Sequence, residues 1–323
     1  MGSANRLLVL VMSERRQHVN DLYQIGQEIL RQASDITIHI ISPRDHADAV
    51  PAAKWRLPAL IVGFSNLGIF IPPRGRIFAP SAVKKLDQVA RFRACEIATP
   101  ETARFEFGKI YEEAEWGQFC VLKPLPLTLT SKGTAILIRT RRLDKIKPAD
   151  FPADHFMRNA PALVQRFIDT GRFPAYHRVM NLFGEPLLWW RGFSPLERPP
   201  LTAPDAELEA AIIEPKDPFI RSNFDVSQRR ELKVAPDVFA FAHRMHEAFP
   251  TIPLKGCDIL REESTGKLYA IEINGGGNVW HFSSAIFRRS RGQMGGRDAM
   301  VEYYDPWPKA ARILIQMTRE HAA

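Results

Sequence analysis

The most constraining part of this sequence is a pair of short apolar segments near its C-terminal end, each of which carries an acidic side chain. The two segments are Gly256–Leu260 (GCDIL) and Tyr269–Asn278 (YAIEINGGGN), and Thr265-Gly266 between them suits a turn. Side chains alternate between the two faces of a strand, so Glu272 and Asn274 share one face. The pattern predicts a pair of strands with one apolar face and one polar face.

The polar face of this strand pair is a candidate metal site. Polar groups on an otherwise apolar strand are costly to bury unless they find partners. If the two strands pair, Asp258 joins Glu272 and Asn274 on the same face. Two carboxylates and an amide offer three oxygen ligands, which suits Mg²⁺ shared with nucleotide phosphates, and Gly275–Gly277 lets the backbone approach a ligand closely. The alternative is a solvated polar face followed by a glycine turn.

The first 80 residues follow the pattern of a small α/β unit. Arg6–Met12 is a continuous apolar run, typical of a strand buried on both faces, and Asn20–Ala33 carries apolar residues at helical spacing. Further strands are expected over Ile36–Ile41, Ala59–Val62 and Arg76–Ala79. This order predicts a partly parallel sheet with helical cover.

The remaining chain is predicted to mix strands with a few helices. The expected helices are Ala82–Cys95, for which Ser81 resembles an N-cap, Pro236–Phe249 and Ala310–Arg319. The expected strands are Phe119–Lys123, Thr134–Arg139, Leu163–Ile168 and a hairpin of Tyr176–Phe183 with Leu187–Phe193. The Pro-rich stretch over 194–220 is expected to run over the surface.

The hairpin predicts a pair of facing arginines. Gly184-Glu185 fits a two-residue type II′ turn, because glycine stands at its first position. In the register that this turn sets, Arg178 lies directly opposite Arg191. Like charges in that position repel, so the pair is either solvated or placed around an anion such as a phosphoryl group.

A lysine marks the end of another apolar strand. Lys123 closes the strand in Phe119–Pro124 (FCVLKP), and a long Pro/Thr-rich loop, Pro124–Gly133, follows it. This arrangement resembles a strand leading into a phosphate-covering loop. A strand end that reaches solvent is the alternative.

Composition narrows the classes of function. The chain has 44 Lys and Arg against 36 Asp and Glu, a formal net charge of +8, which favours anionic partners. Three widely spaced cysteines give neither a disulfide framework nor a zinc site, so a reducing cytoplasm is the simplest location. The apolar run Leu7–Met12 is too short for a signal peptide, and no run reaches the roughly 18 residues of a membrane span. No aromatic-studded module supports nucleic-acid binding.

Five of these segments, in this order, resemble the ATP-grasp superfamily. Within it the likeness is to glutathione synthetase and related carboxylate–amine ligases, over about residues 81–280. The segments are the lysine-led helix within Lys84–Thr102, the strand Phe119–Pro124, the hinge Ala162–Asp169 (ALVQRFID), the strand in Tyr176–Leu187 (YHRVMNLFGEPL), and the acidic pair GCDIL and EINGGGN.

The resemblance implies an α/β (α+β) fold in three parts. Residues 1–80 would form an N-terminal Rossmann-like domain that precedes the ATP-grasp fold. Residues 81–165 would form the small, lid-like ATP-grasp subdomain, and residues 166–323 the C-terminal subdomain with the metal site.

The resemblance also implies roles for single residues. Asp258, Glu272 and Asn274 would bind two Mg²⁺ ions, or Mn²⁺ in their place. Arg178 would stabilise the γ-phosphoryl group and then the acyl phosphate. The hairpin register, and not the resemblance, adds Arg191 as the second candidate catalytic residue. The residues expected to contact ATP are Lys84, Lys85, Lys123, Gln165, Arg166, Phe167 and Ile168.

The activity implied is that of an ATP-dependent carboxylate–amine or carboxylate–thiol ligase. ATP would phosphorylate a carboxylate, and an amine would attack the acyl phosphate to give an amide, ADP and phosphate. The expected partners are a small carboxylic acid and an amine, such as an amino acid or a peptide-like compound, and a homodimer is compatible with the assignment. A small-molecule kinase of the ATP-grasp type and a non-catalytic ATP-binding regulatory protein are the alternatives.

Overall fold

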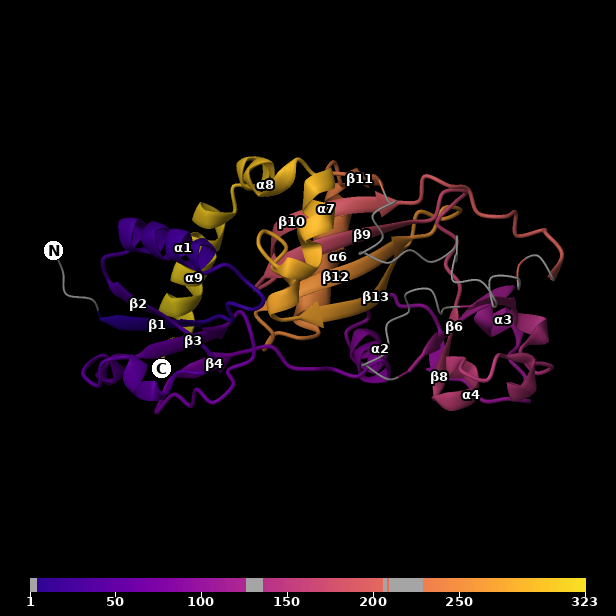
Figure 1. Cartoon of the computed structure of the whole chain (residues 1–323), viewed down its shortest axis with the longest axis horizontal. Helices are drawn as coiled ribbons and strands as arrows, with labels where there is room; N and C mark the ends of the chain where they lie inside the picture. The colour runs from indigo at the N-terminus through magenta and orange to yellow at the C-terminus, as the bar shows by residue number, and fades with distance from the viewer. Residues whose placement is uncertain (1–4, 126–135, 206–207, 209–228) are drawn as a thin grey trace.

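Three β-sheets follow one another along the long axis of the molecule. The computed structural model describes residues 5–125, 136–205, 208 and 229–323. Figure 1 shows the N-terminal sheet at one end, a five-stranded sheet in the middle and a four-stranded sheet at the other end. The C-terminal helix returns to the N-terminal sheet.

The N-terminal sheet has four strands, all paired in parallel, in the order β2-β1-β3-β4. The sequence predicts a partly parallel sheet, and these pairings make the described sheet wholly parallel. Helices α1 and α9 pack against each other, and apolar side chains of both join the core that covers one face of the sheet. The elements are β1 (Arg6–Val11), α1 (Val19–Gln32), β2 (Ile36–Ile41), β3 (Ala59–Gly63), β4 (Arg76–Phe78) and α9 (Pro306–His321).

The four-stranded sheet at the far end has the order β5-β8-β6-β7, and its neighbouring strands run antiparallel. Aromatic and aliphatic residues from β6, β7 and β8 form a separate core with the short helices α3 and α4. The elements are β5 (Thr102–Arg104), α3 (Glu113–Trp116), β6 (Phe119–Pro124), β7 (Ile136–Arg139), α4 (Phe156–Asn159) and β8 (Ala162–Arg166).

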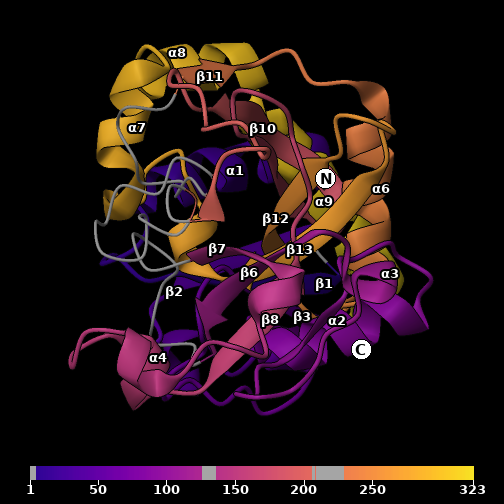
Figure 2. The same cartoon turned by 90° about the vertical axis from the view of Figure 1, so that its right-hand side faces the viewer.

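The five-stranded sheet is antiparallel, with the order β11-β10-β9-β12-β13. Helix α6 covers one face, and Figure 2 shows α6 and α7 on opposite flanks of these strands. The elements are β9 (Ala175–Leu182), β10 (Glu185–Phe193), β11 (Arg229–Glu231), α6 (Pro236–Glu247), β12 (Leu254–Arg261), β13 (Leu268–Gly275), α7 (Arg288–Gln293) and α8 (Gly296–Tyr304). Short 3-10 helices lie at Ala47–Ala49, Lys54–Arg56, Thr140–Arg142, Pro148–Asp150, Gly277–Val279 and Ala285–Phe287.

Helix α2 (Lys85–Ala94) connects the N-terminal sheet to the rest, and it begins later than the sequence predicts. Its N-cap is Lys84, without a side-chain capping bond, so the assignment of Ser81 as N-cap is wrong. The Gln88 side chain explains the late start, because it donates to the carbonyls of Val83 and Ile273. The Gln88 side chain thereby ties Val83 to Ile273 on β13.

One apolar core joins the two ends of the sequence. Residues of α1 and of β1–β4 share it with residues of β9, β10, α8 and α9. The last residue, Ala323, exchanges two backbone hydrogen bonds with Ala59 at the start of β3. Residues 306–323 therefore pack with the N-terminal sheet and α1, which we call the N-terminal unit, although they lie far from it in the sequence. No helix in the described ranges is long and apolar enough to cross a bilayer.

Candidate functional site

The centre of the five-stranded sheet brings three charged residues into one row. In the register of the sheet, Asp258 on β12 lies between Arg178 on β9 and Glu272 on β13. The Arg178 Nε atom lies 2.9 Å from Asp258 Oδ1, and their side chains are only 5% and 13% exposed. We call the face of the sheet opposite α6 the open face. It carries an ion pair whose two side chains are largely buried.

The acidic residues and the amide predicted to share a face do meet there. The Asn274 Nδ2 atom donates to Asp258 Oδ2 and to Glu272 Oε1, at 3.2 Å each. Gly256, beside Asp258, leaves room for Arg178, because a Cβ atom at this position would lie 2.3 Å from Arg178 Nη1. The strand alternation thus places the three candidate ligands correctly; their role in metal binding remains a prediction.

The electrostatics of this group favour a bound cation. Burial, the largest cause, and the nearby Glu272 carboxylate raise the pKa of Asp258 to about 7, against the opposing charge of Arg178. Within the described part of the chain no cluster of three or more His, Cys, Asp or Glu residues has metal-site geometry, so the donor set here is two carboxylates and one amide. Hard oxygen donors of this kind fit Mg²⁺.

Two lysines come to this acidic group from the neighbouring sheet and helix. The Lys123 Nζ atom donates to Gln165 Oε1 at 2.8 Å, and its charge helps to lower the pKa of Asp258. The Lys85 Nζ atom donates to the Pro124 carbonyl oxygen at 3.1 Å. Burial lowers the pKa of Lys85, and the negative charge of Glu272 opposes that shift. Both lysines are therefore placed near the carboxylates on β12 and β13.

The other residues expected to contact nucleotide lie where β8 leaves the four-stranded sheet. Gln165 is buried, and its Nε2 atom donates to Thr102 Oγ1. Arg166 forms an ion pair with Glu262 at 3.6 Å, which links this sheet to the end of β12. The backbone N–H of Phe167 donates to the Phe119 carbonyl, and Ile168 is buried. Lys84 adjoins Lys85 as the N-cap of α2.

The prediction that Arg178 faces Arg191 is wrong. The turn consists of Phe183 and Gly184, both with positive φ, which is one residue earlier than predicted and typical of a type I′ turn. A bulge between Pro186 and Leu188 then shifts the register by one residue. Arg178 consequently pairs with Trp190.

This one-residue difference sends Arg191 to the other face of the sheet. Arg191 pairs with His177 on β9, and its Nη1 atom lies 2.9 Å from Glu231 Oε2. The structure therefore does not bring Arg191 to the acidic group.

Several residues on the open face are absent from the sequence-based set. Tyr176 is buried two positions before Arg178, so strand alternation could have identified it. The fully buried His281 and partly buried Arg230 could not be found in that way. Arg230 belongs to a three-residue charged strand, and His281 lies in an irregular loop, so neither has a periodic apolar pattern around it.

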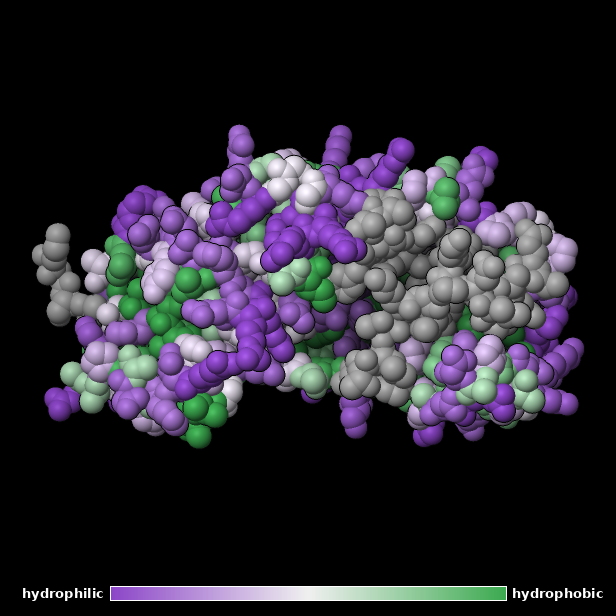
Figure 3. Space-filling model, in the orientation of Figure 1, coloured by the Kyte–Doolittle hydropathy of each residue, from purple (hydrophilic) through white to green (hydrophobic). Residues whose placement is uncertain are grey.

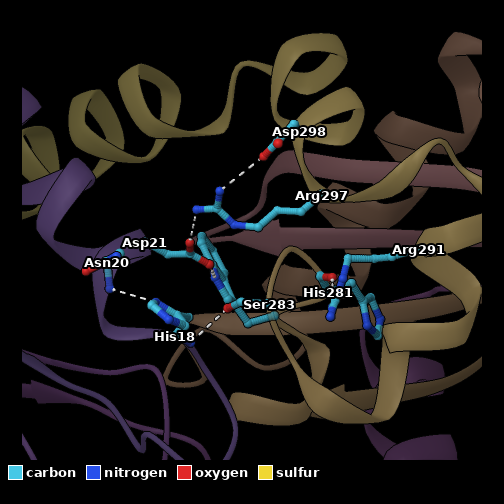
Figure 4. A network of polar contacts seen from close by, with 9 residues as sticks. His18, Asn20, Asp21, His281, Ser283, Arg291, Arg297 and Asp298 are labelled. Atoms are coloured by element: carbon cyan, nitrogen blue, oxygen red, sulfur yellow. Dashed lines mark hydrogen bonds and ion pairs between the residues drawn. The ribbon is translucent and has the colours of Figure 1, made fainter.

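The N-terminal unit holds this loop in place (Figure 4). The Asp21 side chain at the start of α1 is completely buried, and it accepts hydrogen bonds from Trp280 Nε1 at 2.9 Å and Arg297 Nη2 at 2.5 Å. The His18 backbone N–H donates to Ser283 Oγ at 2.9 Å. Trp280 and Ser283 thus tie the loop after β13 to the start of α1, and Arg297 ties α8 to the same Asp21 carboxylate.

The similarity of this chain to known proteins lies in structure. No protein-family model matches the chain, and no curated protein matches it in sequence. Among solved structures, the ATP-grasp ligase PsnB complexed with minimal precursor, Mg and ADP matches with a TM-score of 0.51 at 11% identity, covering 98% of this chain and 99% of PsnB.

Other solved structures match over similar lengths. PsnB complexed with a phosphomimetic variant of the minimal precursor, Mg and ADP has a TM-score of 0.50 at 11% identity, covering 98% and 100% of the two chains. The D-alanine–D-alanine ligase from Bacillus anthracis complexed with ATP has a TM-score of 0.43 at 13% identity, covering 96% and 99%. The PsnB matches establish the fold of this chain.

Proposed function

Since this chain has the ATP-grasp fold, we propose that it is an ATP-dependent ligase that joins a carboxylate to an amine or a thiol. The observation that carries the proposal is the convergence of opposite charges on one face of the five-stranded sheet. Arg178 pairs with Asp258 there, beside Glu272 and Asn274, and Lys123 and Lys85 approach from the neighbouring elements. Phosphoryl transfer depends mainly on positioning and charge stabilisation, and this arrangement can supply both.

One group of residues would bind the metal ion of MgATP, and another would bind its phosphates. Asp258, Glu272 and Asn274 would hold Mg²⁺, which when bound neutralises charge on phosphate oxygens. Lys85 and Lys123 would contact the phosphates. The Gln165 side chain already accepts from Lys123, so the hinge from Gln165 to Ile168 would meet the adenine mainly through backbone atoms.

Arg178 would act on the group being transferred. A carboxylate oxygen of the substrate attacks the γ-phosphorus, the bond to ADP breaks, and an acyl phosphate forms. The amine or thiol then attacks the acyl carbon and phosphate leaves. Arg178 is fixed by Asp258, so its guanidinium is held in place before the charge on the phosphoryl oxygens develops.

A screen of magnesium-dependent ADP release tests this proposal. The full chain is incubated with MgATP and pools of small carboxylic acids, with and without amines or thiols. Amine- or thiol-dependent ADP release together with an amide or thioester product supports the ligase. Stable phosphorylated product without an amine, or ATP binding without turnover on any acid, contradicts it and favours a kinase or a regulatory protein.

A further inference from the structure

The open face of the five-stranded sheet continues well beyond the proposed ATP site. Glu272, Asp258, Arg178 and Trp190 form one row of Cα partners across four strands. A second row, two residues further along, runs through Tyr176 on β9, Gly192 on β10 and Arg230 on β11. Strands are about 4.8 Å apart, so roughly 19 Å separate β13 from β11. The face is acidic at β13 and basic at β11.

The absence of a side chain at Gly192 leaves room in this second row for an aromatic ring. A Cβ atom on Gly192 would lie 2.5 Å from the Tyr176 ring. The Tyr176 hydroxyl accepts from Trp190 Nε1 at 3.2 Å. The Arg230 guanidinium lies 5.9 Å from the Trp190 ring centroid and 5.7 Å from that of Phe287. The Arg230 guanidinium therefore lies within cation–π distance of two aromatic rings at the β11 edge of the sheet.

Helix α7 adds a second arginine to this edge. The Arg291 Nη1 atom donates to the carbonyl oxygens of His281 at 2.9 Å and Ser284 at 2.8 Å, and Figure 4 shows Arg291 beside His281. The Arg230 Nη2 atom donates to Ser290 Oγ at 3.0 Å on the same helix. Over α7 the molecular surface in Figure 3 is strongly hydrophilic. We call Arg230, Arg291, His281 and Ser284 the basic end.

The imidazole of His281 is the unusual member of the basic end. The residue is only 3% exposed, and neither of its ring nitrogens has a hydrogen-bond partner among the described residues. The Ser284 hydroxyl, also fully buried, lacks a partner in the same part of the chain. Buried polar atoms in folded proteins are nearly always hydrogen-bonded. These three atoms therefore indicate a place where a polar ligand or ordered water belongs.

The charges around His281 favour an anion over a neutral ligand. Burial, the largest cause, and the positive charges of Arg178, Arg291 and Arg230 lower the pKa of His281 well below its ordinary value. A neutral imidazole offers one donor and one acceptor. The carboxylate of Asp21, whose charge acts on Arg291, is already bound by Trp280 and Arg297.

We propose that the basic end binds a second anionic group of the substrate, a carboxylate or a phosphate, while the reacting carboxylate lies beside Arg178. The substrate class is then a dianion, with its two charged groups on the same sheet face. This inference rests on the proposed ligase function. It adds a requirement on the substrate that the ATP site itself does not impose.

The test is calorimetric titration of the full chain with inorganic phosphate, succinate and butyrate, after saturation with MgADP. Wild type is expected to bind phosphate or succinate and not butyrate. Arg230→Met should weaken that binding at least tenfold and leave MgADP affinity within twofold. Arg289→Met, which removes an exposed arginine of α7, is the matched control and should bind as wild type does. Preference for succinate or for phosphate identifies the anionic group.

Three results would contradict the proposal that the basic end binds an anion. They are no binding of phosphate or succinate by wild type, equally tight binding of butyrate, or an equal loss of affinity in Arg230→Met and Arg289→Met. If Arg230→Met does not fold by circular dichroism, His281→Leu decides in its place, with at least fivefold weaker binding expected. Failure of MgADP itself to bind contradicts the proposed ligase instead. In that case the phosphate and succinate titrations of wild type and the variants are carried out without nucleotide, and the same outcomes decide the second proposal.

Discussion

The two faces of the five-stranded sheet pack differently around β9 and β12, although the same strands build both. On the α6 face, Val179, Cys257 and Ile259 pack against Val238, Ala242 and Met245 of the helix. On the opposite face, Arg178 and Asp258 pair in the proposed site, while Met180 and Trp190 pack in the core shared with the N-terminal elements. Alternation along a strand is enough to separate the two roles, so a shift of one residue in register would exchange them.

Substitutions placed one residue apart, on opposite faces, should therefore differ in whether they affect nucleotide binding and turnover. Changes on the α6 face should lower the free energy of unfolding and leave nucleotide binding intact. Changes on the open face should act on turnover. Four predictions follow from this difference, beginning with the largest effect.

Glu272→Gln should abolish magnesium-dependent ADP release while the protein remains folded. The substitution removes one candidate metal carboxylate and preserves the shape of the side chain, and Asn274 can still bond to it. Turnover is measured as ADP release, and folding by thermal denaturation. Glu302→Gln, at an exposed position of α8, is the control and should be fully active. Normal turnover in Glu272→Gln would contradict the assignment of Glu272 as a metal ligand.

Arg178→Met should lower turnover and also destabilise the protein without ligand. The facing-arginine register would make this substitution slightly stabilising, since it would relieve a repulsion. In the observed register Arg178 pairs with Asp258, and removing one partner of a buried pair costs about 3–5 kcal/mol. Urea denaturation distinguishes the two registers. Unchanged or increased stability would mean that the ion pair does not form.

Ile259→Ala, next in sequence to Asp258, should destabilise the protein without affecting the nucleotide site. Ile259 is completely buried against α6, and such a truncation in a packed core costs about 2–5 kcal/mol. The expected result is a large loss in the free energy of unfolding by urea denaturation, with MgADP affinity unchanged by calorimetry. Loss of affinity at a temperature where the variant is folded would show that the two faces are coupled.

Much of the fold could be predicted because its elements have strong local patterns. The apolar run of β1 and the helical spacing of α1 predict both elements within one residue at each end. Asp258, Glu272 and Asn274 were brought together because alternation on two adjacent strands suffices to place them.

The register of the hairpin depends on features that leave no such pattern. Phe183 adopts a positive φ in the turn, a conformation that side-chain-bearing residues rarely adopt. The bulge before Leu188 then adds a residue to one strand. His281 gains its place through the contacts of its loop with Asp21 and Arg291 and of its ring with Trp190 and Phe287. Tertiary contacts of this kind cannot be deduced from local sequence.

Lys255 is a buried charged residue on the α6 face, and its predicted contribution to stability depends on pH. Lys255 is completely buried at the start of β12, and its Nζ atom donates to the carbonyl oxygens of Phe249 and Ile252 after α6. Burial lowers its pKa to about 7, from an ordinary value of about 10.4 in the unfolded chain. Between these values the unfolded chain binds more protons, so the contribution of Lys255 to stability increases as pH rises and is lost as pH falls through about 7.

Lys255→Met should remove this dependence, because methionine fills a similar volume without a titrating group. Urea denaturation at about pH 7 and about pH 9.5 measures it, within the window set by the two pKa values. From the lower to the higher pH, wild type should gain stability relative to Lys255→Met, since only wild type carries the ammonium that burial disfavours. The two carbonyl oxygens stabilise the ammonium in part, which makes the gain smaller than burial alone would give. Parallel stability curves for the two proteins would show that Lys255 retains its proton across this range, and that the α6 face tolerates a charge as the open face does.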